Sequence, residues 1–397
     1  MLAPSRPSAP YTLYRTERFA DGSGPHGWRR ARRIALAGAL VALIPALVSF
    51  ASMLTQPSNS SFFINVVEWM RANGARGLVD TIENEYYTLT APAKGGPALK
   101  KLTRQRGALA VIPAVPTIRV HVVHHYRPPN IPPLTHGLPG EGVWESTFAD
   151  GGSRPPVLIT QFRPEPFEYP QVVVGVAWID HTRTSVQLNP GMQEPAVPMA
   201  TRGPGEVPTW MRSHLVATFN SGFKLADSGG GFVWHGHTYA PLGNGLATIV
   251  GYTDGTVNVI KWEGGSTAPP NIAWARQNLP LIVNNGRPNP NLNDGPQWGA
   301  TLGGADLVWR SAVGIDRHGN LIYASGPDQG LDTIATTMIH AGAVRAMELD
   351  INTYWTSFIT YRNPGAGNPA NLLNSMDRSP FRYLTPDDRD FFAVYVR

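Results

Sequence analysis

The longest apolar run in the chain covers residues 34–54, reads IALAGALVALIPALVSFASML and contains no charged residue. As an α-helix rising 1.5 Å per residue it would span about 30 Å, the thickness of the hydrocarbon core of a bilayer. Four arginines stand directly before it in WRRARR (28–33), and the next basic residue is Arg71. Because basic residues stay on the cytoplasmic side, the pattern predicts a single-pass helix with a cytoplasmic N-terminus and everything after residue 55 outside.

A cleaved signal peptide is the alternative interpretation of the same run. Ser49 and Ala51 have the small side chains and the spacing that a signal peptidase requires. The run is, however, longer than the about 7 to 15 apolar residues of a signal peptide. A polar tail also precedes the arginines. These two features favour a retained anchor.

Short apolar runs bounded by turn residues dominate the chain from Val143 onward and predict β-strands, among them PVLITQF, QVVVGVAWI and HLVATF. Asp254-Gly255 joins ATIVGYT to TVNVIKW, which predicts a hairpin. A second hairpin is predicted in SAVGIDRHGNLIYAS. The segment LDTIATTMIHAGA (331–343) instead repeats its apolar residues at helical spacing, and the strand-like VRAMELDIN follows it directly.

These patterns predict an α+β fold, a β-rich mixed-sheet domain with few helices. We divide the chain into a cytoplasmic tail (1–33), a transmembrane helix (34–54), juxtamembrane helices followed by a Pro-rich connector (55–142), and the β-rich domain (143–397). The connector includes RPPNIPPLTHGLPG, whose prolines favour a stiff linker. With 41 glycines, 37 prolines and only 15% charged residues, the composition favours many turns and short strands.

The net charge of +5 belongs to the first 54 residues, which hold seven arginines against Glu17 and Asp21. The rest of the chain is balanced, and it shows no basic face with interleaved aromatic residues that would predict binding of nucleic acid. The chain has no cysteine. That excludes disulfides, thiolate nucleophiles and cysteine-ligated zinc, and it fits an exported protein.

Candidate catalytic groups lie on the predicted strand RAMELDIN. Side chains alternate along a strand, so Glu348, Asp350 and Asn352 share one face. Two carboxylates about 6.5 to 7 Å apart along a strand fall within the spacing of glycosidase acid/base or nucleophile pairs. An exposed strand with a solvated polar face is the alternative.

Further candidates lie outside this strand. Asn220 and Lys224 flank the turn in FNSGFK and could hold a sugar hydroxyl or a phosphate oxygen. Arg276 and Arg310 match the geometry of phosphate, although either could equally pair with a carboxylate. His235 and His237 form an H-x-H pair beside a glycine, which is more typical of a hairpin than of a metal site.

From Val143 to Arg397 the order of motifs resembles the phosphodiester glycosidase family, which is related to the enzyme that removes N-acetylglucosamine from a phosphodiester-linked mannose. The family's A-x-N-G-G-F-F segment is matched by ATFNSGFK (217–224), its Arg-Thr-Ala-x-G-x-D hairpin by WRSAVGIDRHGNL, and its G-A-x-x-A-x-N-L-D segment by AGAVRAMELD. The ending RYLTPDDRDFFAVYVR is similar to that of a membrane-anchored bacterial branch. The family's Asn stands as Glu348 here, and Ile351-Asn352-Thr353-Tyr354 replaces its Gly-Gly-Gly-Ser.

The resemblance implies an extracytoplasmic hydrolase of glycosidic linkages, such as a sugar 1-phosphodiester in a cell-envelope polymer. Asp350 and Glu348 would supply acid/base or nucleophilic catalysis, and Arg310, Lys224, Arg276, Asn220 and Asn352 would bind substrate. We expect no cofactor and no metal among the site residues, with a divalent metal left open. The expected partners are the envelope carbohydrate and, through the anchor, membrane lipid. A glycan-binding protein without catalysis and a membrane scaffold remain the alternatives.

Overall fold

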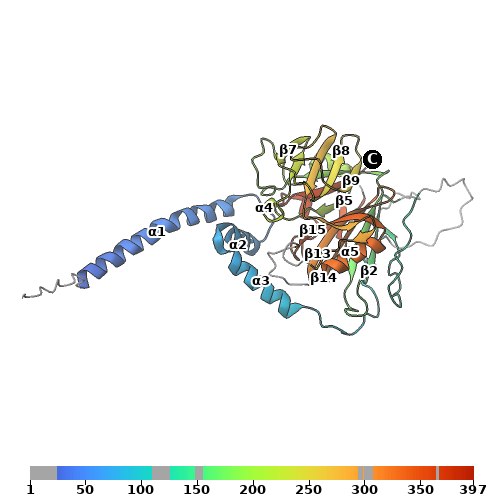
Figure 1. Cartoon of the computed structure of the whole chain (residues 1–397), viewed down its shortest axis with the longest axis horizontal. Coiled ribbons are helices and arrows are strands. Elements are labelled where there is room, and N and C mark those ends of the chain that lie inside the picture. The colour runs from blue at the N-terminus through green and yellow to red at the C-terminus, as the bar shows by residue number, and fades with distance from the viewer. Residues whose placement is uncertain (1–24, 110–125, 148–154, 294–297, 299–306, 364–365) are drawn as a thin grey trace, which may run out of the picture. The chain divides into compact units, whose positions relative to one another are not determined.

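The computed structural model describes residues 25–109, 126–147, 155–293, 298, 307–363 and 366–397. It divides into two compact units, Met1–Gln56 and Pro57–Arg397. The second unit is built from three sheets with few helices, which confirms the predicted β-rich fold (Figure 1). The two units are described separately below.

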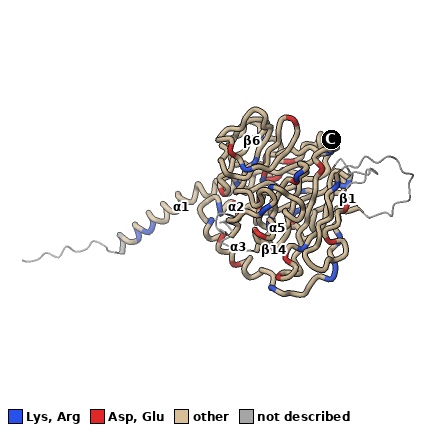
Figure 2. Tube along the Cα trace, turned by 45° about the vertical axis from the view of Figure 1, so that its right-hand side comes forward, with Lys and Arg blue, Asp and Glu red and all other residues tan. Residues whose placement is uncertain are grey.

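The first unit contains α1 (Pro25–Thr55), a 31-residue helix. Its part from Trp28 to Thr55 is long and apolar enough to cross a membrane, and a signal sequence near an N-terminus would meet the same description. Basic residues lie near the start of this helix and the rest of it carries no charge (Figure 2).

The largest sheet has eight strands in the order β1-β2-β3-β14-β13-β15-β11-β12. Its strands are β1 (Glu145–Ser146), β2 (Val157–Phe162), β3 (Val174–Ile179), β14 (Leu321–Gln329), β13 (Val308–Asp316), β15 (Ala343–Ile351), β11 (Leu281–Asn284) and β12 (Arg287–Pro288). Neighbouring strands are antiparallel throughout. Helix α5 (Leu331–His340) connects β14 to β15 and packs on this sheet.

Two five-stranded antiparallel sheets complete the unit, in the orders β17-β16-β5-β18-β4 and β7-β6-β10-β8-β9. The first contains β17 (Gly367–Asn371), β16 (Phe358–Asn363), β5 (Leu215–Asn220), β18 (Phe391–Val396) and β4 (Thr184–Asn189). The second contains β7 (His237–Ala240), β6 (Phe232–Trp234), β10 (Ile272–Gln277), β8 (Ala247–Tyr252) and β9 (Val257–Lys261). The short helices are α4 (Leu225–Ser228), η2 (Thr209–His214) and η5 (Arg382–Leu384).

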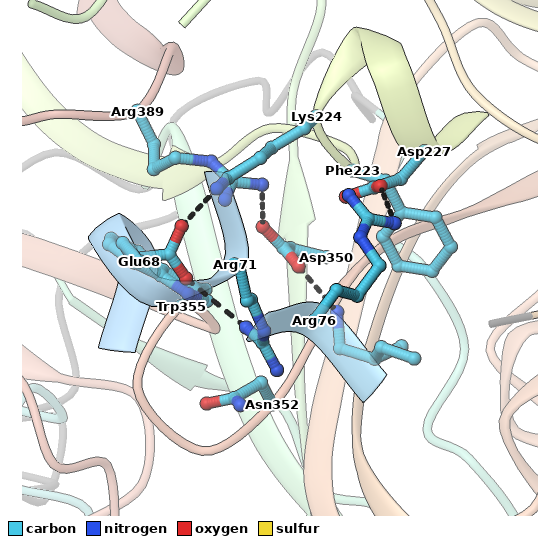
Figure 3. Close-up of a pocket in the computed structure, with 11 residues that line it drawn as sticks. Glu68, Arg71, Arg76, Phe223, Lys224, Asp227, Asp350, Asn352, Trp355 and Arg389 are labelled. Atoms are coloured by element: carbon cyan, nitrogen blue, oxygen red, sulfur yellow. Dashed lines mark hydrogen bonds and ion pairs between the residues drawn. The ribbon is translucent and has the colours of Figure 1, made fainter. Parts of the chain in front are cut away.

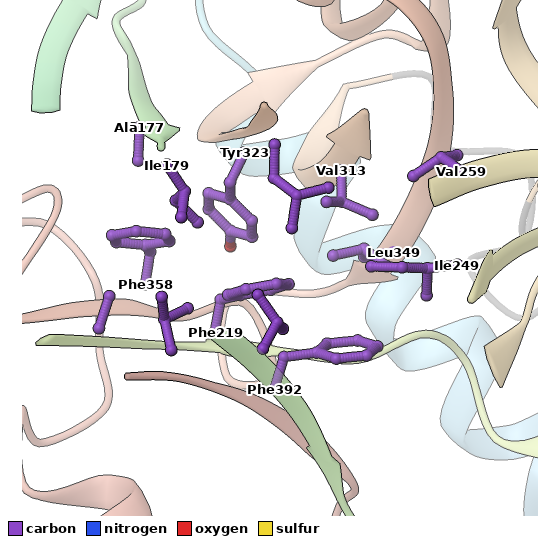
Figure 4. Close-up of a cluster of buried hydrophobic side chains, with 14 of the residues drawn as sticks. Ala177, Ile179, Phe219, Ile249, Val259, Val313, Tyr323, Leu349, Phe358 and Phe392 are labelled. Atoms are coloured by element: carbon purple, nitrogen blue, oxygen red, sulfur yellow. The ribbon is translucent and has the colours of Figure 1, made fainter. Parts of the chain in front are cut away.

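The main hydrophobic core draws side chains from all three sheets. Phe219, Phe358 and Phe392 of one five-stranded sheet stack beside Tyr323 of the eight-stranded sheet (Figure 4). A second cluster fills the space between the other face of the eight-stranded sheet and α5. The eight-stranded sheet is therefore buried on both faces, which explains why its strands read as nearly continuous apolar runs.

Several predicted local elements are confirmed. β8 and β9 form the hairpin expected at Asp254-Gly255, where Gly255 adopts the positive φ of 83° that this turn requires. β13 and β14 form the second hairpin, and α5 and β15 follow in the predicted order. The segment His235-Gly236 is the turn of the β6–β7 hairpin, as its sequence favoured.

The predicted juxtamembrane helices are α2 (Phe62–Met70) and α3 (Arg76–Thr90), and the π-helical turn η1 (Arg71–Ala75) joins them. They belong to the same compact unit as the sheets. Their only buried hydrophobic side chain in the described structure is that of Val79, whereas six large apolar side chains on them are exposed: Phe62, Phe63, Leu78, Ile82, Tyr86 and Leu89. Tyr87 of α3 also packs, partly buried, against the cluster of Phe223, Val308 and Ile351.

Candidate active site

A pocket lies where β15 ends, between the sheets and the helices α2 to α3 (Figure 3). Its lining combines four cationic residues, three carboxylates, two aromatic rings and two further side chains, namely Arg71, Arg76, Lys224, Arg389, Glu68, Asp227, Asp350, Phe223, Trp355, Ile351 and Asn352. Of the predicted site residues, Lys224, Asp350 and Asn352 are among them. The cavity volume is about 50 Å³.

Asp350 is the penultimate residue of β15, and its carboxylate closes one side of the pocket. One oxygen accepts a hydrogen bond of 2.6 Å from Nη2 of Arg389, and the other accepts one of 3.0 Å from the backbone N–H of Ile351. Burial raises the pKa of Asp350 to about 6, against the opposing effect of the Arg389 and Arg382 cations. A carboxyl group with this pKa changes its protonation state close to neutral pH.

Arg389 belongs to the loop Thr385–Asp390, which leads into β18. It donates to Asp350, and its guanidinium lies 4.9 Å from the ring centre of Trp355. Within the described part of the chain its Nε atom has no hydrogen-bond acceptor. Burial disfavours this cation, but the surrounding carboxylates, Asp350 first, outweigh burial and raise the pKa of Arg389.

Arg389 was not identified from the sequence, although the sequence carries a signal. Asp387-Asp388-Arg389-Asp390 is a run of four charges in a chain with 15% charged residues, and the buried strand FFAVYV follows directly. Each of the four is bonded inside the protein: Asp387 to Arg378 and Arg382, Asp388 to Ser58 and Ser60, Arg389 to Asp350, and Asp390 to Arg276. Such a run before a buried strand indicates paired charges.

Lys224 follows the turn after β5 and precedes α4. Its ammonium group pairs with the carboxylate of Glu68, which comes from α2. The other oxygen of Glu68 accepts a hydrogen bond of 3.2 Å from Arg71. Burial opposes ionisation of Glu68, but Lys224, Arg389 and Arg71 outweigh it and lower the pKa of Glu68. Glu68 is therefore a carboxylate anion inside the pocket.

The rest of the lining provides shape and one more ion pair. Arg76 of α3 pairs with Asp227 of α4 at 2.7 Å. Asn352 adopts a positive φ of 106° directly after β15, and its Oδ1 accepts a hydrogen bond from the N–H of Tyr354. The side-chain amide nitrogen of Asn352 stays available to a ligand in the described structure.

Glu348 does not line the pocket, in the part of the chain that the structure describes. It is fully buried, and one of its oxygens accepts a hydrogen bond of 2.6 Å from Arg310 on the neighbouring strand β13. Arg310 also donates to the carbonyl of Gln329 at 2.9 Å. Burial raises the pKa of Glu348 to about 7, and Arg310 opposes that rise. Glu348 and Arg310 form an interior pair two residues along the strand from Asp350.

Asn220 and Arg276 are also buried, and their polar atoms are used by the protein itself. Asn220 donates to Ser311 Oγ and accepts from Tyr323 and from the N–H of Ser357. Arg276 pairs with Asp390 at 2.8 Å and donates to the carbonyls of Gln277 and Phe223. These two residues hold the base of the FNSGFK loop, and their predicted contact with substrate stays a prediction.

No three His, Cys, Asp or Glu side chains of the described residues come together as a potential metal site. The pocket instead offers a near-neutral carboxyl group beside fixed cations and an indole ring. A group such as Asp350 can donate or accept a proton. Cations in a partly buried site stabilise negative charge, as found on a phosphate or a departing oxygen.

Comparisons with known proteins add a remote likeness. No family model matches the chain, and no curated protein matches it. The solved structure of a zebrafish N-acetylglucosamine-1-phosphodiester alpha-N-acetylglucosaminidase catalytic domain, auto-inhibited by its pro-peptide, is similar at 17% identity and a TM-score of 0.40, over 63% of this chain and 86% of that one. A hypothetical protein from Synechocystis is similar at 13% identity and a TM-score of 0.30, over 57% of this chain and 59% of that one.

Proposed function

We propose that the protein is a membrane-anchored hydrolase that cleaves glycosidic linkages outside the cytoplasm, in particular sugar 1-phosphodiesters of cell-envelope glycans. The observation that carries the proposal is the carboxyl group of Asp350, which lines a pocket beside Arg389 and Lys224 and whose pKa is raised to about 6. An acid/base group with a near-neutral pKa beside anion-binding cations is what the hydrolysis of such a linkage requires.

In this proposal Asp350 gives its proton to the departing oxygen as the bond from the anomeric carbon to that oxygen breaks. Water adds to the anomeric carbon and returns a proton to Asp350. Lys224 and Arg389 face the anionic group of the substrate, and the ring of Trp355 offers an apolar surface to a sugar. Asn352 binds a sugar hydroxyl through its side-chain amide. Glu348 and Arg310 have a structural part in this proposal, because their buried ion pair joins β13 to β15 two residues before Asp350.

The proposed location rests on α1. The length of the apolar segment favours a retained anchor, and the arginines before it favour a cytoplasmic N-terminus, which leaves the sheets outside. A reporter fused after residue 60 should then be active only outside the cytoplasm. The proposed partners are an envelope carbohydrate or sugar-phosphate polymer and the lipid around the anchor, with no nucleic acid and no cofactor.

The test is turnover by the full-length chain in detergent on an activated sugar 1-phosphodiester. Two matched probes, one without the phosphate and one without the sugar, separate the contributions of the two groups. We expect hydrolysis to be fastest with the complete probe and to change with an apparent pKa near 6. Saturable glycan binding with no turnover would instead support a binding protein. A partner protein that copurifies in stoichiometric amount, with neither turnover nor glycan binding, would support a membrane scaffold.

A further inference from the structure

Glu68 fills the pocket from an element that is not part of the sheets. It lies 156 residues before Lys224 in the chain, on helix α2, and its carboxylate reaches across the pocket to the Lys224 ammonium group (Figure 3). The side chain of Glu68 is only 13% exposed. A carboxylate is an anion of the same charge type as a substrate phosphate, so Glu68 stands where a ligand anion would be favourable.

The space that remains is too small for the proposed substrate. The cavity volume is about 50 Å³, and one water molecule needs about 10 to 15 Å³ of the same measure. A sugar ring cannot enter unless some of the lining moves. The part of the lining contributed by α2, η1 and α3 comprises Glu68, Arg71 and Arg76.

These helices bury few apolar side chains. Val79 is their one buried hydrophobic residue in the described structure. Tyr87 of α3 packs, partly buried, against the cluster of Phe223, Val308 and Ile351. Polar contacts add to this: Arg76 pairs with Asp227, and just before α2 the side chains of Ser58 and Ser60 bond to Asp388. Segments with few buried apolar contacts open locally at a small fraction of the global free energy of unfolding.

We propose that Lys224 and Arg389 form the anion-binding subsite of the pocket, that Glu68 occupies this subsite in the closed state seen here, and that an anionic substrate enters by displacing Glu68 and its helices. The inference rests on the proposed function for the identity of the substrate, a phosphate-bearing glycan. The binding of an anion by Lys224 and Arg389 does not depend on the proposed function. Inorganic phosphate is therefore a sufficient probe.

The first experiment measures phosphate affinity in the full-length chain by equilibrium titration. Glu68→Gln removes the competing charge while keeping the shape of the side chain, so it should bind phosphate at least ~10-fold more tightly than the original chain. The double variant Glu68→Gln/Lys224→Gln should lose that gain. An unchanged affinity in Glu68→Gln would overturn the proposal. So would a gain that persists without Lys224, because phosphate would then bind elsewhere.

The second experiment tests the movement and uses the absence of cysteine from the chain. Arg76→Cys/Asp227→Cys places two thiols across the contact between α3 and α4. A short bifunctional thiol reagent with a reducible link would join them. Bridged protein should bind phosphate at least ~10-fold more weakly than the same variant after reduction. Equal phosphate binding before and after reduction would mean that the helices need not move.

The two proposals can fail separately. If no variant hydrolyses the sugar phosphodiester but the phosphate results hold, the hydrolase function is wrong and the subsite stands. If hydrolysis occurs and Glu68→Gln changes neither turnover nor phosphate affinity, the subsite assignment is wrong and the hydrolase function stands.

Discussion

Glu348 and Asp350 lie two residues apart on one strand and have nearly the same partner geometry, yet their surroundings differ. Each carboxylate accepts a hydrogen bond of 2.6 Å from an arginine. Arg310, the partner of Glu348, lies on the next strand of the same sheet, and the pair is enclosed between sheet and helix. Arg389, the partner of Asp350, comes from a loop and faces a pocket. The ion pair itself therefore does not distinguish a structural carboxylate from a reactive one.

Access to a ligand makes that distinction. Burial raises the pKa of both groups, to about 7 for Glu348 and about 6 for Asp350. Of these two groups, the Asp350 carboxyl lines the pocket and can exchange a proton with a molecule bound there. A perturbed pKa is a useful indicator of a functional site only when it is read together with the lining of a cavity.

The largest expected effect separates the two carboxylates by activity. Asp350→Asn keeps the shape of the site and removes the transferable proton, so turnover should fall by about 10²- to 10⁴-fold. Glu348→Gln imitates the protonated acid that burial favours, and its turnover should stay within a few fold of the original. Both rates are measured on an activated sugar phosphodiester, with melting temperature on the same preparations. Equal losses in the two variants would remove the distinction.

The next effect concerns stability. Arg310→Leu leaves two buried acceptors, Glu348 and the carbonyl of Gln329, without a donor, at about 1 to 3 kcal/mol for each. The free energy of unfolding should fall by about 3 kcal/mol. Arg310→Lys is the matched control, because it keeps the charge but loses the fork of donors. Its free energy of unfolding should lie between those of the original chain and of Arg310→Leu. Urea titrations of the three proteins give the comparison, and an unchanged midpoint for Arg310→Leu would contradict it.

A further effect is the dependence of stability on pH. The ordinary pKa values are 4.5 for Glu348 and 3.8 for Asp350, and the folded values lie above them. The folded protein therefore binds more protons than the unfolded chain between about pH 4 and pH 7, so stability falls as pH rises through this window. Glu348→Gln should make the fall in stability between pH 4.5 and pH 7 smaller. A rise in stability across the window would show that the two arginines outweigh burial.

The smallest predicted effect is on substrate binding. Lys224→Gln removes one cation from the pocket and should raise KM by ~10-fold, with a smaller change in kcat, because the charge contacts the bound substrate in all states. Lys261→Gln on β9 is the control, since that lysine pairs with Glu263 on the surface. A larger effect on kcat than on KM would assign Lys224 to the transition state instead.

Local features were accessible from the sequence because they depend on neighbours in the chain. The turn at Asp254-Gly255 and the helical spacing in 331–340 each predict one element, and the structure contains both. Strand alternation correctly set Met347 and Leu349 toward the core shared by the sheets. It also placed Glu348 with Asp350, but alternation gives a face and not access, and this sheet is covered on both faces.

The parts of the site that come from distant segments were not accessible. Glu68 lies on a helix whose pattern predicts only an amphipathic surface, and nothing near it in the chain points to Lys224, 156 residues away. Arg389 reaches Asp350 across 39 positions. Such pairings are set by how the sheets and helices pack, which no local periodicity records.

The most direct test of the account is to locate a bound ligand. Crystals of Glu68→Gln soaked with a hexose 1-phosphate should show the phosphate within about 2.7 to 3.2 Å of Lys224 Nζ and an Arg389 nitrogen, with the sugar beside Trp355 and Asp350. A ligand bound instead in another pocket, such as the one lined by Arg106, Arg362 and Asn374, would contradict the account. So would an empty pocket at a ligand concentration that saturates binding in solution.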